Sequence, residues 1–313
     1  MLDIPADEVR ALLPWGALVD AVREMFRQGC EMPVRNHHTV AVPGDPDATL
    51  LLMPAWLPGE YLGVKVATIF PGNAAREQDA VSASYILMSG RSGETLAIID
   101  GGELTARRTA ATSVLAASFL ARPKTANHLI VGTGRMAANL AAAYASARPL
   151  RRLTIWGRNP DKAAALAGRL RDSGIEARAE VELATAVAEA DIVTTCTLSV
   201  DPLVKGAWLR PGTHLDLVGG FRPDMREVDD AAVGRASVFV DTIDGAPTEA
   251  GDLVQPLERG ILAASDIKTD LYGLVRGAHP GRETDDEITM FKSVGASLED
   301  LAGAVLAYQN AGP

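Results

Sequence analysis

The second part of the chain alternates apolar strand-like segments with helical segments, and this alternation constrains the fold more than any other feature. The strand-like segments include HLIVG, RLTIWG, DIVTTCT, HLDLVGG and SVFVDT, and helix-like stretches such as MAANLAAAYASA and DKAAALAGRLRDSG separate them. Strands joined through helices favour a doubly wound parallel sheet, because each crossover helix packs back onto the sheet. We therefore predict an α/β domain of the Rossmann type over residues 123–295.

A different pattern precedes Pro123. The first 28 residues show helical spacing of apolar side chains, whereas residues 32–100 contain short β-rich runs separated by Gly, Pro and Asp. The later segment ELTARRTAATSVLAASFLA predicts a helix that ends at Pro123. We therefore expect residues 1–122 to form an α+β domain with a mainly antiparallel sheet. The amphipathic C-terminal segment 296–313 is expected to pack back on this domain.

Composition narrows the range of partners. The 313 residues are 47% hydrophobic and 22% charged, as in folded globular proteins, and the formal net charge is −10. A negative chain repels nucleic acids and anionic membrane surfaces, so neither is expected as a partner. The first ten residues carry acids rather than a basic and apolar leader, and no run is long enough to span a bilayer, which predicts a cytoplasmic protein.

The segment VGTGRMA contains a glycine pattern, G-x-G-x-x-A, between a predicted strand and an Ala-rich helix. Gly132 permits a tight turn, Gly134 lets a pyrophosphate approach the helix N-terminus, and the small Ala137 permits close packing of helix on strand. The alternative is a glycine turn in another kind of α/β protein, but the surrounding β-α-β pattern favours dinucleotide binding. Arg135 and Met136, within the motif, belong to the same predicted cofactor site.

The end of the second predicted strand bears on the choice of cofactor. NAD-specific enzymes place an acid there, about twenty residues after the glycines, to bind the ribose hydroxyls. This chain has Arg158 and Asn159 instead, with Lys162 one turn later, and an arginine suits a 2′-phosphate. NADP(H) is therefore favoured, with the use of NAD(H) left open. The alternative is a solvated basic residue at an exposed helix start.

Two further strand ends are expected to flank the nicotinamide. The segments TTCT and LVGG fall at the carboxyl ends of the fourth and fifth predicted strands, where ligands bind in open α/β sheets. The residues concerned are Thr195, Cys196, Thr197 and Gly219. The threonines are equally consistent with strand residues selected for β-propensity.

Three cations of the first domain stand in apolar or β-rich segments: Arg35, Lys65 and Arg108. A charge in such a segment is costly unless it is paired, so an anionic substrate shared by all three is one interpretation. Three unrelated surface charges are the other. For one of the two neighbouring residues Arg107 and Arg108, a position on a solvated helix face is the better interpretation. The histidines form no ligand set, so no metal is implied, and no nucleophile motif is present.

In this order and spacing, the segments MPVR, LGVKVATIFPGN, ELTARRTAATS, VGTGRMA, LVGG and ITMFKSVGASLEDLAGA resemble the ornithine cyclodeaminase/mu-crystallin family over nearly the whole chain. The resemblance implies a homodimer formed through the N-terminal sheet domain, which would also bind substrate. It implies that Arg35, Lys65 and Arg108 bind the substrate carboxylate and that Ser293 lies near the nicotinamide. The family contains cyclodeaminases, alanine dehydrogenase-like enzymes, cyclic ketimine reductases and a crystallin.

The chain departs from the cyclodeaminases at two positions. Those enzymes carry an aspartate directly after the glycines of the fifth strand, where this chain has Phe221, and a second acidic contact is missing near Leu51. An apolar residue suits a ring rather than an open-chain diamine. The chain thus resembles the ketimine reductase branch, which reduces Δ1-pyrroline-2-carboxylate and Δ1-piperideine-2-carboxylate to proline and pipecolate with NAD(P)H. Ornithine cyclodeaminase activity, and NADPH binding without turnover, remain the alternatives.

Overall fold

The computed structural model describes residues 1–76 and 78–312, and it divides into two compact units. The first unit is Met1–Thr109 with Ser297–Pro313, and the second is Ala110–Ala296. The division falls inside helix α3 (Gly101–Leu120), earlier than the boundary expected after residue 122. The reason is that α3 is one continuous helix that contributes residues to both units, so the end of the helix does not mark the division.

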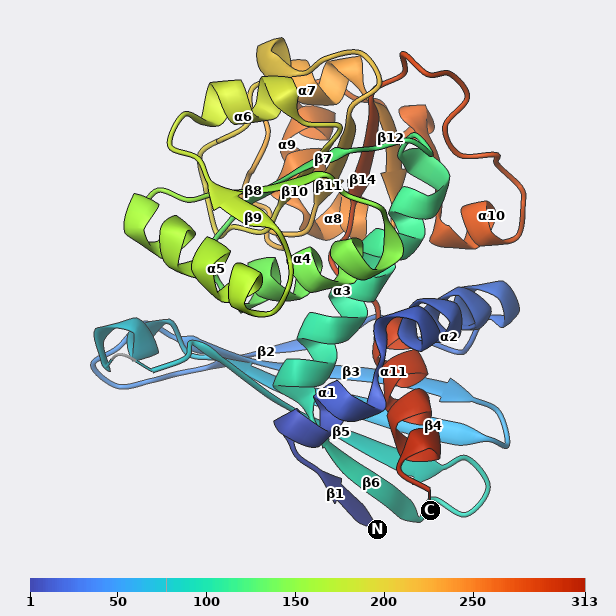
Figure 1. Cartoon of the computed structure of the whole chain (residues 1–313). Coiled ribbons are helices and arrows are strands. Elements are labelled where there is room, and N and C mark those ends of the chain that lie inside the picture. Colours follow the sequence, from blue (N-terminus) through green and yellow to red (C-terminus); the bar gives the residue numbers. More distant parts are fainter. Residues whose placement is uncertain (77, 313) are drawn as a thin grey trace. The chain divides into compact units, whose positions relative to one another are not determined.

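The first unit contains, within the described residues, a six-stranded sheet in the order β1-β6-β5-β4-β3-β2 (Figure 1). Strands β2 to β6 are antiparallel neighbours, as the sequence predicted. Their bounds are Asn36–Val40, Ala48–Leu57, Tyr61–Ile69, Val81–Ser89 and Thr95–Asp100, and the short helix η1 (Pro71–Arg76) follows β4.

The N-terminal segment differs only at its start from the helical pattern that the sequence predicted for the first 28 residues. It begins with β1 (Leu2–Ile4), which pairs in parallel with β6, and continues with helices α1 (Ala6–Leu12) and α2 (Trp15–Gln28). A three-residue strand is too short to show a period of two, so only pairing with β6 reveals it.

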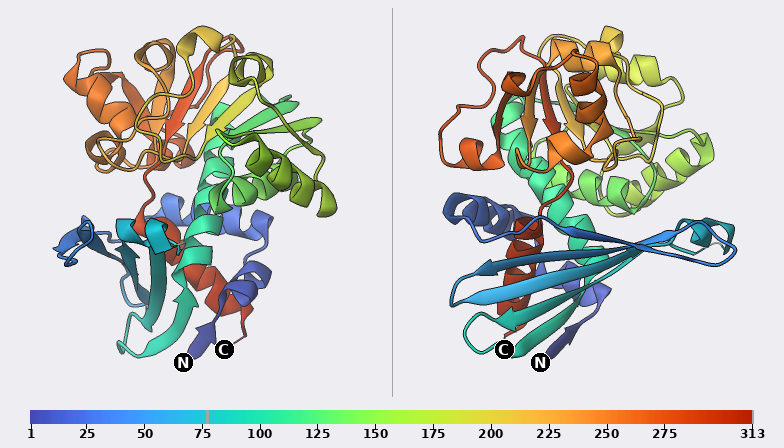
Figure 2. Two further views of the ribbon diagram at one scale, coloured as in Figure 1. Left: turned by 90° about the vertical axis from the view of Figure 1, so that its left-hand side faces the viewer. Right: turned by 180° about the vertical axis from the view of Figure 1, so that it is seen from behind.

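Side chains of the first sheet alternate between two faces, because successive residues of a strand point to opposite sides. On one face the side chains of β3 to β6 are buried, among them Met53, Lys65, Tyr85 and Ile99. Helix α11 (Ser297–Asn310) lies along this face (Figures 1 and 2), so the C-terminal segment packs on the N-terminal sheet as expected.

The second unit contains, over the described residues, an eight-stranded parallel sheet in the order β13-β12-β14-β11-β10-β7-β8-β9. The five strands from the β9 edge inward, β9-β8-β7-β10-β11, have the order of a doubly wound Rossmann sheet, which confirms the predicted fold class. These strands are Ala177–Ala179, Arg152–Trp156, Asn127–Val131, Ile192–Thr195 and His214–Leu217, and β12 (Ser237–Val240), β13 (Ile267–Asp270) and β14 (Thr289–Lys292) complete the sheet.

Helices connect the strands of the second unit and bury an apolar core that includes Val131, Val193 and Leu217. The α-helices are α4 (Arg135–Ala147), α5 (Pro160–Asp172), α6 (Leu183–Glu189), α7 (Asp230–Arg235), α8 (Ala246–Glu249), α9 (Gly251–Glu258) and α10 (Leu271–Val275); the shorter helices are η2 (Gly206–Trp208) and η3 (Ala264–Asp266). None of the helices in the described part of the chain is both long and apolar enough to cross a membrane.

Candidate active site

The glycine turn between β7 and α4 is built as the sequence predicted. Gly132 has φ +146°, and a Cβ on this residue would lie 2.6 Å from the Sγ of Cys196, so a side chain is excluded by conformation and by space. Gly134 is the N-cap of α4, and a Cβ there would meet no atom within 4 Å. Open space thus borders the N-terminus of a 13-residue helix, whose free N–H groups and dipole favour an anion.

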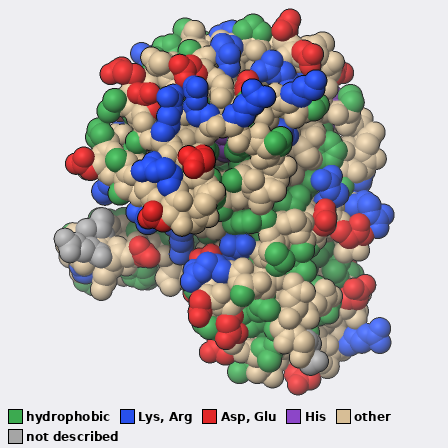
Figure 3. Space-filling model, in the orientation of Figure 1, with side chains coloured by type: hydrophobic (Ala, Val, Ile, Leu, Met, Phe, Trp, Pro, Cys, Tyr) green, Lys and Arg blue, Asp and Glu red, His purple; other side chains and the backbone are tan. Residues whose placement is uncertain are grey.

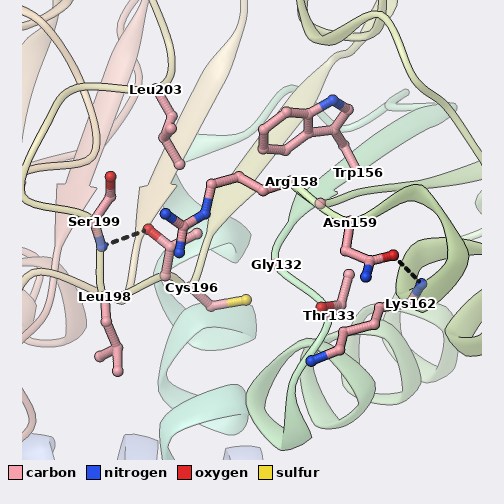
Figure 4. A pocket seen from close by; sticks show the side chains of 12 residues that line it. Gly132, Thr133, Trp156, Arg158, Asn159, Lys162, Cys196, Leu198, Ser199 and Leu203 are labelled. Atoms are coloured by element: carbon pink, nitrogen blue, oxygen red, sulfur yellow. Dashed lines mark hydrogen bonds between the residues drawn. The ribbon is translucent and has the colours of Figure 1, made fainter.

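A cavity of about 340 Å³ lies beside this turn, at the carboxyl ends of β7, β8 and β10 (Figure 4). The end of β8 contributes Asn159, which caps α5 by accepting hydrogen bonds from the backbone N–H groups of Asp161 and Lys162. The cap fixes the direction in which the chain leaves the strand. The lining residues are Gly132, Thr133, Trp156, Gly157, Arg158, Asn159, Lys162, Cys196, Thr197, Leu198, Ser199 and Leu203.

The charge of the cavity is positive. Among the described residues that line it, Arg158 and Lys162 are cationic and none is acidic. Figure 4 shows the Arg158 side chain reaching from the end of β8 across the cavity toward the wall that carries Cys196 and Ser199. Lys and Arg side chains also gather on the face of this unit seen in Figure 3, although the net charge of the chain is −10. The cavity therefore suits a phosphate-bearing ligand.

The remaining residues predicted for the cofactor site divide into two groups. Cys196 and Thr197 line the cavity, whereas Thr195 is fully buried and donates a hydrogen bond to Glu227. Arg135 is exposed and Met136 half-buried at the start of α4, and neither lines the cavity. Gly219 and Ser293 are buried and also lie outside the lining, and so does Phe221, which was predicted to contact the substrate and is half-buried.

The first unit holds a cluster of buried charges. The Nζ of Lys65 lies 2.7 Å from Oδ2 of Asp300, and the Nε of Arg108 donates to Oδ1 of the same carboxylate at 2.7 Å. Arg108 also donates to Glu299. These four side chains are at most 5% exposed. Two of the three predicted cations thus converge on one aspartate, which fixes the orientation of both.

Burial and charge set the proton affinities in this cluster. Burial lowers the pKa of Lys65 to about 8; the carboxylate of Asp300 opposes this shift, and Arg108 and Arg35 add to it. Burial by itself would raise the pKa of Asp300, but Arg108 and Lys65 hold it below its ordinary value. Lys65 therefore exchanges a proton near neutral pH beside an aspartate that stays ionised.

Arg35, the third predicted cation, is half-buried and precedes β2. Its charge lowers the pKa of Lys65, so it belongs to the same electrostatic neighbourhood. The expected solvated position for Arg107 or Arg108 is wrong, because both side chains are buried. Arg107 donates to the backbone oxygen of Leu13 and stacks 3.9 Å from the centroid of the Trp15 ring, contacts that compensate for its burial.

Sequence reasoning missed the anions that hold these cations, and it missed a second buried group formed by Glu227, Asp252 and Lys292. The signal that identified Lys65, a charged residue within an apolar segment, was present for both groups. Glu299 and Asp300 stand in the otherwise small and apolar segment SLEDLAGA, and Lys292 ends the apolar run ITMFK. Across residues 1–76 and 78–312, no three His, Cys, Asp or Glu side chains are grouped so as to hold a metal ion.

The sequence model of the ornithine cyclodeaminase/mu-crystallin family matches residues 5–312. The Δ1-pyrroline-2-carboxylate reductase of Paracoccus denitrificans is 42% identical over 285 residues, which cover 90% of this chain and 89% of that protein.

Solved structures agree with the sequence match. The Δ1-pyrroline-2-carboxylate reductase of Thermococcus litoralis, in complex with NADH and L-proline, matches with a TM-score of 0.93 at 32% identity, covering 99% of this chain and 97% of that one. An archaeal alanine dehydrogenase dimer with bound NAD matches with a TM-score of 0.90 at 28% identity, covering 99% and 96%.

Proposed function

The chain belongs to the ornithine cyclodeaminase/mu-crystallin family, and on that premise we propose that it reduces cyclic imino acids with a nicotinamide cofactor. The substrates are Δ1-pyrroline-2-carboxylate and Δ1-piperideine-2-carboxylate, and the products are L-proline and L-pipecolate. The observation that carries the proposal is the pair of buried cations, Lys65 and Arg108, oriented by Asp300. Relatives named Δ1-pyrroline-2-carboxylate reductase at 42% and 32% identity support it.

Arg35 and Arg108 bind the carboxylate of the substrate in this proposal. A guanidinium offers five N–H donors in a planar fork that matches a carboxylate, and the contacts of Arg108 with Asp300 and Glu299 hold that fork in one orientation. A fixed carboxylate fixes the position of the adjacent C=N bond, so much of the rate acceleration is positioning.

Lys65 supplies the proton. Because burial lowers its pKa to about 8, the ammonium is both populated at neutral pH and ready to lose a proton. Transfer of this proton to the imine nitrogen makes an iminium carbon, which accepts a hydride far more readily than a neutral imine. A nicotinamide cofactor bound in the cavity of the second unit would supply that hydride, and the neutral lysine regains its proton from solvent.

Phe221 favours reduction over ammonia loss. A phenyl ring neither donates nor accepts the protons that a departing amine requires, and it offers an apolar surface to the methylene groups of a ring substrate. Ornithine cyclisation is therefore expected to be negligible.

The cavity of the second unit binds the cofactor, with NADP(H) preferred over NAD(H). Its residues fit a dinucleotide, since Gly132 and Gly134 leave room at the N-terminus of α4 for the pyrophosphate. Arg158 and Lys162 supply two positive charges for a 2′-phosphate, and no described lining residue is an acid that would repel it.

The protein functions as a homodimer in this proposal, and a cytoplasmic location stays a prediction from the sequence. The face of the first sheet opposite α11 is apolar and only half-buried, where Val66, Val64 and Leu62 of β4 lie beside neighbours on β3 and β5. These neighbours are Leu52, Pro54, Trp56, Ile86 and Met88. A second copy would bury this face. Sedimentation equilibrium of the wild type and of Val64→Glu tests it, because a lasting dimer in the variant contradicts the assignment.

Direct assay tests the proposed reaction. The purified protein is mixed with NADPH or NADH and Δ1-pyrroline-2-carboxylate, and the nicotinamide absorbance and the proline formed are measured together. We expect equal amounts of cofactor oxidised and proline produced, faster with NADPH. The same protein with NAD(P) and L-ornithine reports ammonia and proline; faster turnover there, or binding of NADPH without any oxidation, would refute the proposal.

A further inference from the structure

Glu227 is a fully buried acid next to the cavity of the second unit. One of its oxygens accepts hydrogen bonds from the backbone N–H of Thr197 at 2.7 Å and from the Thr197 hydroxyl at 2.8 Å. The other accepts from the Thr195 hydroxyl at 2.7 Å. Three donors from the last residue of β10 and the segment after it therefore converge on a single carboxylate that solvent does not reach.

A second acid and a lysine hold Glu227 in place. Oδ1 of Asp252 accepts from the backbone N–H groups of Glu227 and Val228 at 2.8 and 3.1 Å, and its Oδ2 lies 3.2 Å from Nζ of Lys292. The Lys292 ammonium also donates to the backbone oxygen of Gly219. Burial raises the pKa of Glu227 to about 7, and the charge of Lys292 opposes that rise.

The glycine at the end of β11 is required by this arrangement. A Cβ on Gly219 would lie 2.1 Å from the backbone oxygen of Thr197 and 2.5 Å from an oxygen of Glu227. Only a residue without a side chain lets the two strand ends approach so closely. The close approach of the LVGG segment is therefore to the Thr197 segment and its carboxylate.

The Thr197 segment is one wall of the cavity, since Cys196, Thr197, Leu198 and Ser199 all line it. The Thr197 hydroxyl also accepts a hydrogen bond from the backbone N–H of Ser199 at 3.3 Å (Figure 4). The hydrogen bonds that begin at Glu227 therefore extend to Ser199 in the cavity wall. We propose that Glu227 is a positioning residue for the cofactor, which fixes the cavity wall 196–199 through Thr195 and Thr197 without touching the ligand. This inference rests on the proposed binding of a nicotinamide cofactor in the cavity.

A neighbouring group of similar chemistry provides the control. Asp216, on β11, is also fully buried and accepts hydrogen bonds from Ser113, Tyr144 and Thr194. None of these four residues lines the cavity. Thr194 and Thr195 are adjacent, both are fully buried, and each donates its hydroxyl to a buried acid. They differ in that only the acid bound by Thr195 holds the cavity wall.

The experiment compares Thr195→Val with Thr194→Val, and adds Glu227→Gln and Thr195→Ser. The dissociation constants of NADPH and NADH are measured by titration calorimetry, which needs no turnover, and thermal unfolding of each variant is recorded. We expect Thr195→Val to weaken cofactor binding about threefold and Glu227→Gln on the order of tenfold, as loss of hydrogen bonds to a charged group implies. Thr194→Val should lower the melting temperature about as much as Thr195→Val does but leave cofactor binding unchanged. Thr195→Ser, which keeps the hydroxyl, should bind the cofactors as the wild type does.

Different results distinguish a failure of the proposed function from a failure of the positioning role of Glu227. If the wild type binds neither cofactor, the proposed function fails. If the wild type binds and both valine variants lose affinity equally, or neither does, the wall does not depend on Glu227 and the inference is overturned. Should Glu227→Gln not fold, Thr195→Val and Thr194→Val still decide the question, because each replaces a single hydroxyl with a methyl group of similar size.

Discussion

Asp300→Asn removes one negative charge at the point where two buried cations converge. Lys65 and Arg108 each lie 2.7 Å from a different oxygen of this carboxylate, and the three side chains are 5%, 4% and 0% exposed. Removing one partner of a buried ion pair costs about 3–5 kcal/mol, because a charge is left in the interior without compensation. We expect the free energy of unfolding of the first unit to fall by about this amount at pH 6.

The loss should shrink as the pH rises. In the wild type the pKa of Lys65 is about 8, since burial lowers it while Asp300 opposes the shift. Without the Asp300 charge the folded-state pKa moves lower still, whereas the unfolded lysine keeps a pKa near 10.4. Above this new folded-state pKa, Lys65 of the folded variant is neutral and no longer destabilises it as a buried charge. In the unfolded variant, Lys65 still carries its proton. The stability of the variant then rises by at most about 1.4 kcal/mol per pH unit relative to the wild type, up to pH 8.

Hydrogen exchange measures this stability locally. Amides of β4 and α11 report the opening of the first unit, and exchange is recorded at pH 6 and pH 9 with correction for the intrinsic rates. Glu24→Gln is the control, because its ion pair with Arg27 is on the surface of the same unit and should leave the exchange unchanged. An Asp300→Asn protein as stable as the wild type at pH 6, or equally destabilised at both pH values, would refute the reasoning.

Three further predictions concern ligand binding and catalysis. Arg158→Ala should weaken NADPH binding about tenfold and NADH binding little, measured by titration calorimetry, and equal losses with both cofactors would remove the 2′-phosphate assignment. Phe221→Asp should slow reduction of Δ1-pyrroline-2-carboxylate without producing ornithine turnover; a variant that releases ammonia from ornithine would show that this position alone decides the reaction. The kcat/KM of the wild type should fall as the pH rises through about 8, because Lys65 loses the proton it donates, and a flat profile from pH 7 to pH 9.5 would exclude Lys65 as the donor.

Local pattern was enough to predict the two sheets, the glycine turn and the cations of the candidate site. The Rossmann sheet, the glycine turn at Gly132 and the antiparallel sheet follow from short-range rules, namely the periods of strands and helices and the conformations that glycine alone adopts. The cations Lys65 and Arg108 were also identified locally, because a charge in an apolar segment is costly wherever that segment folds.

Pairing depended on the tertiary structure. Lys65 and Asp300 are 235 residues apart, and Thr195 and Glu227 are 32 apart, so neither contact leaves a short-range pattern. The same holds for β14, a short apolar strand that only the assembled sheet places between β11 and β12. The sequence by itself determined that each buried charge needs a partner, because the interior cannot solvate an isolated ion. The packing of segments distant in the chain decided which partner each buried charge has. The reason is that only an arrangement with opposite charges within hydrogen-bonding distance compensates for the loss of their hydration.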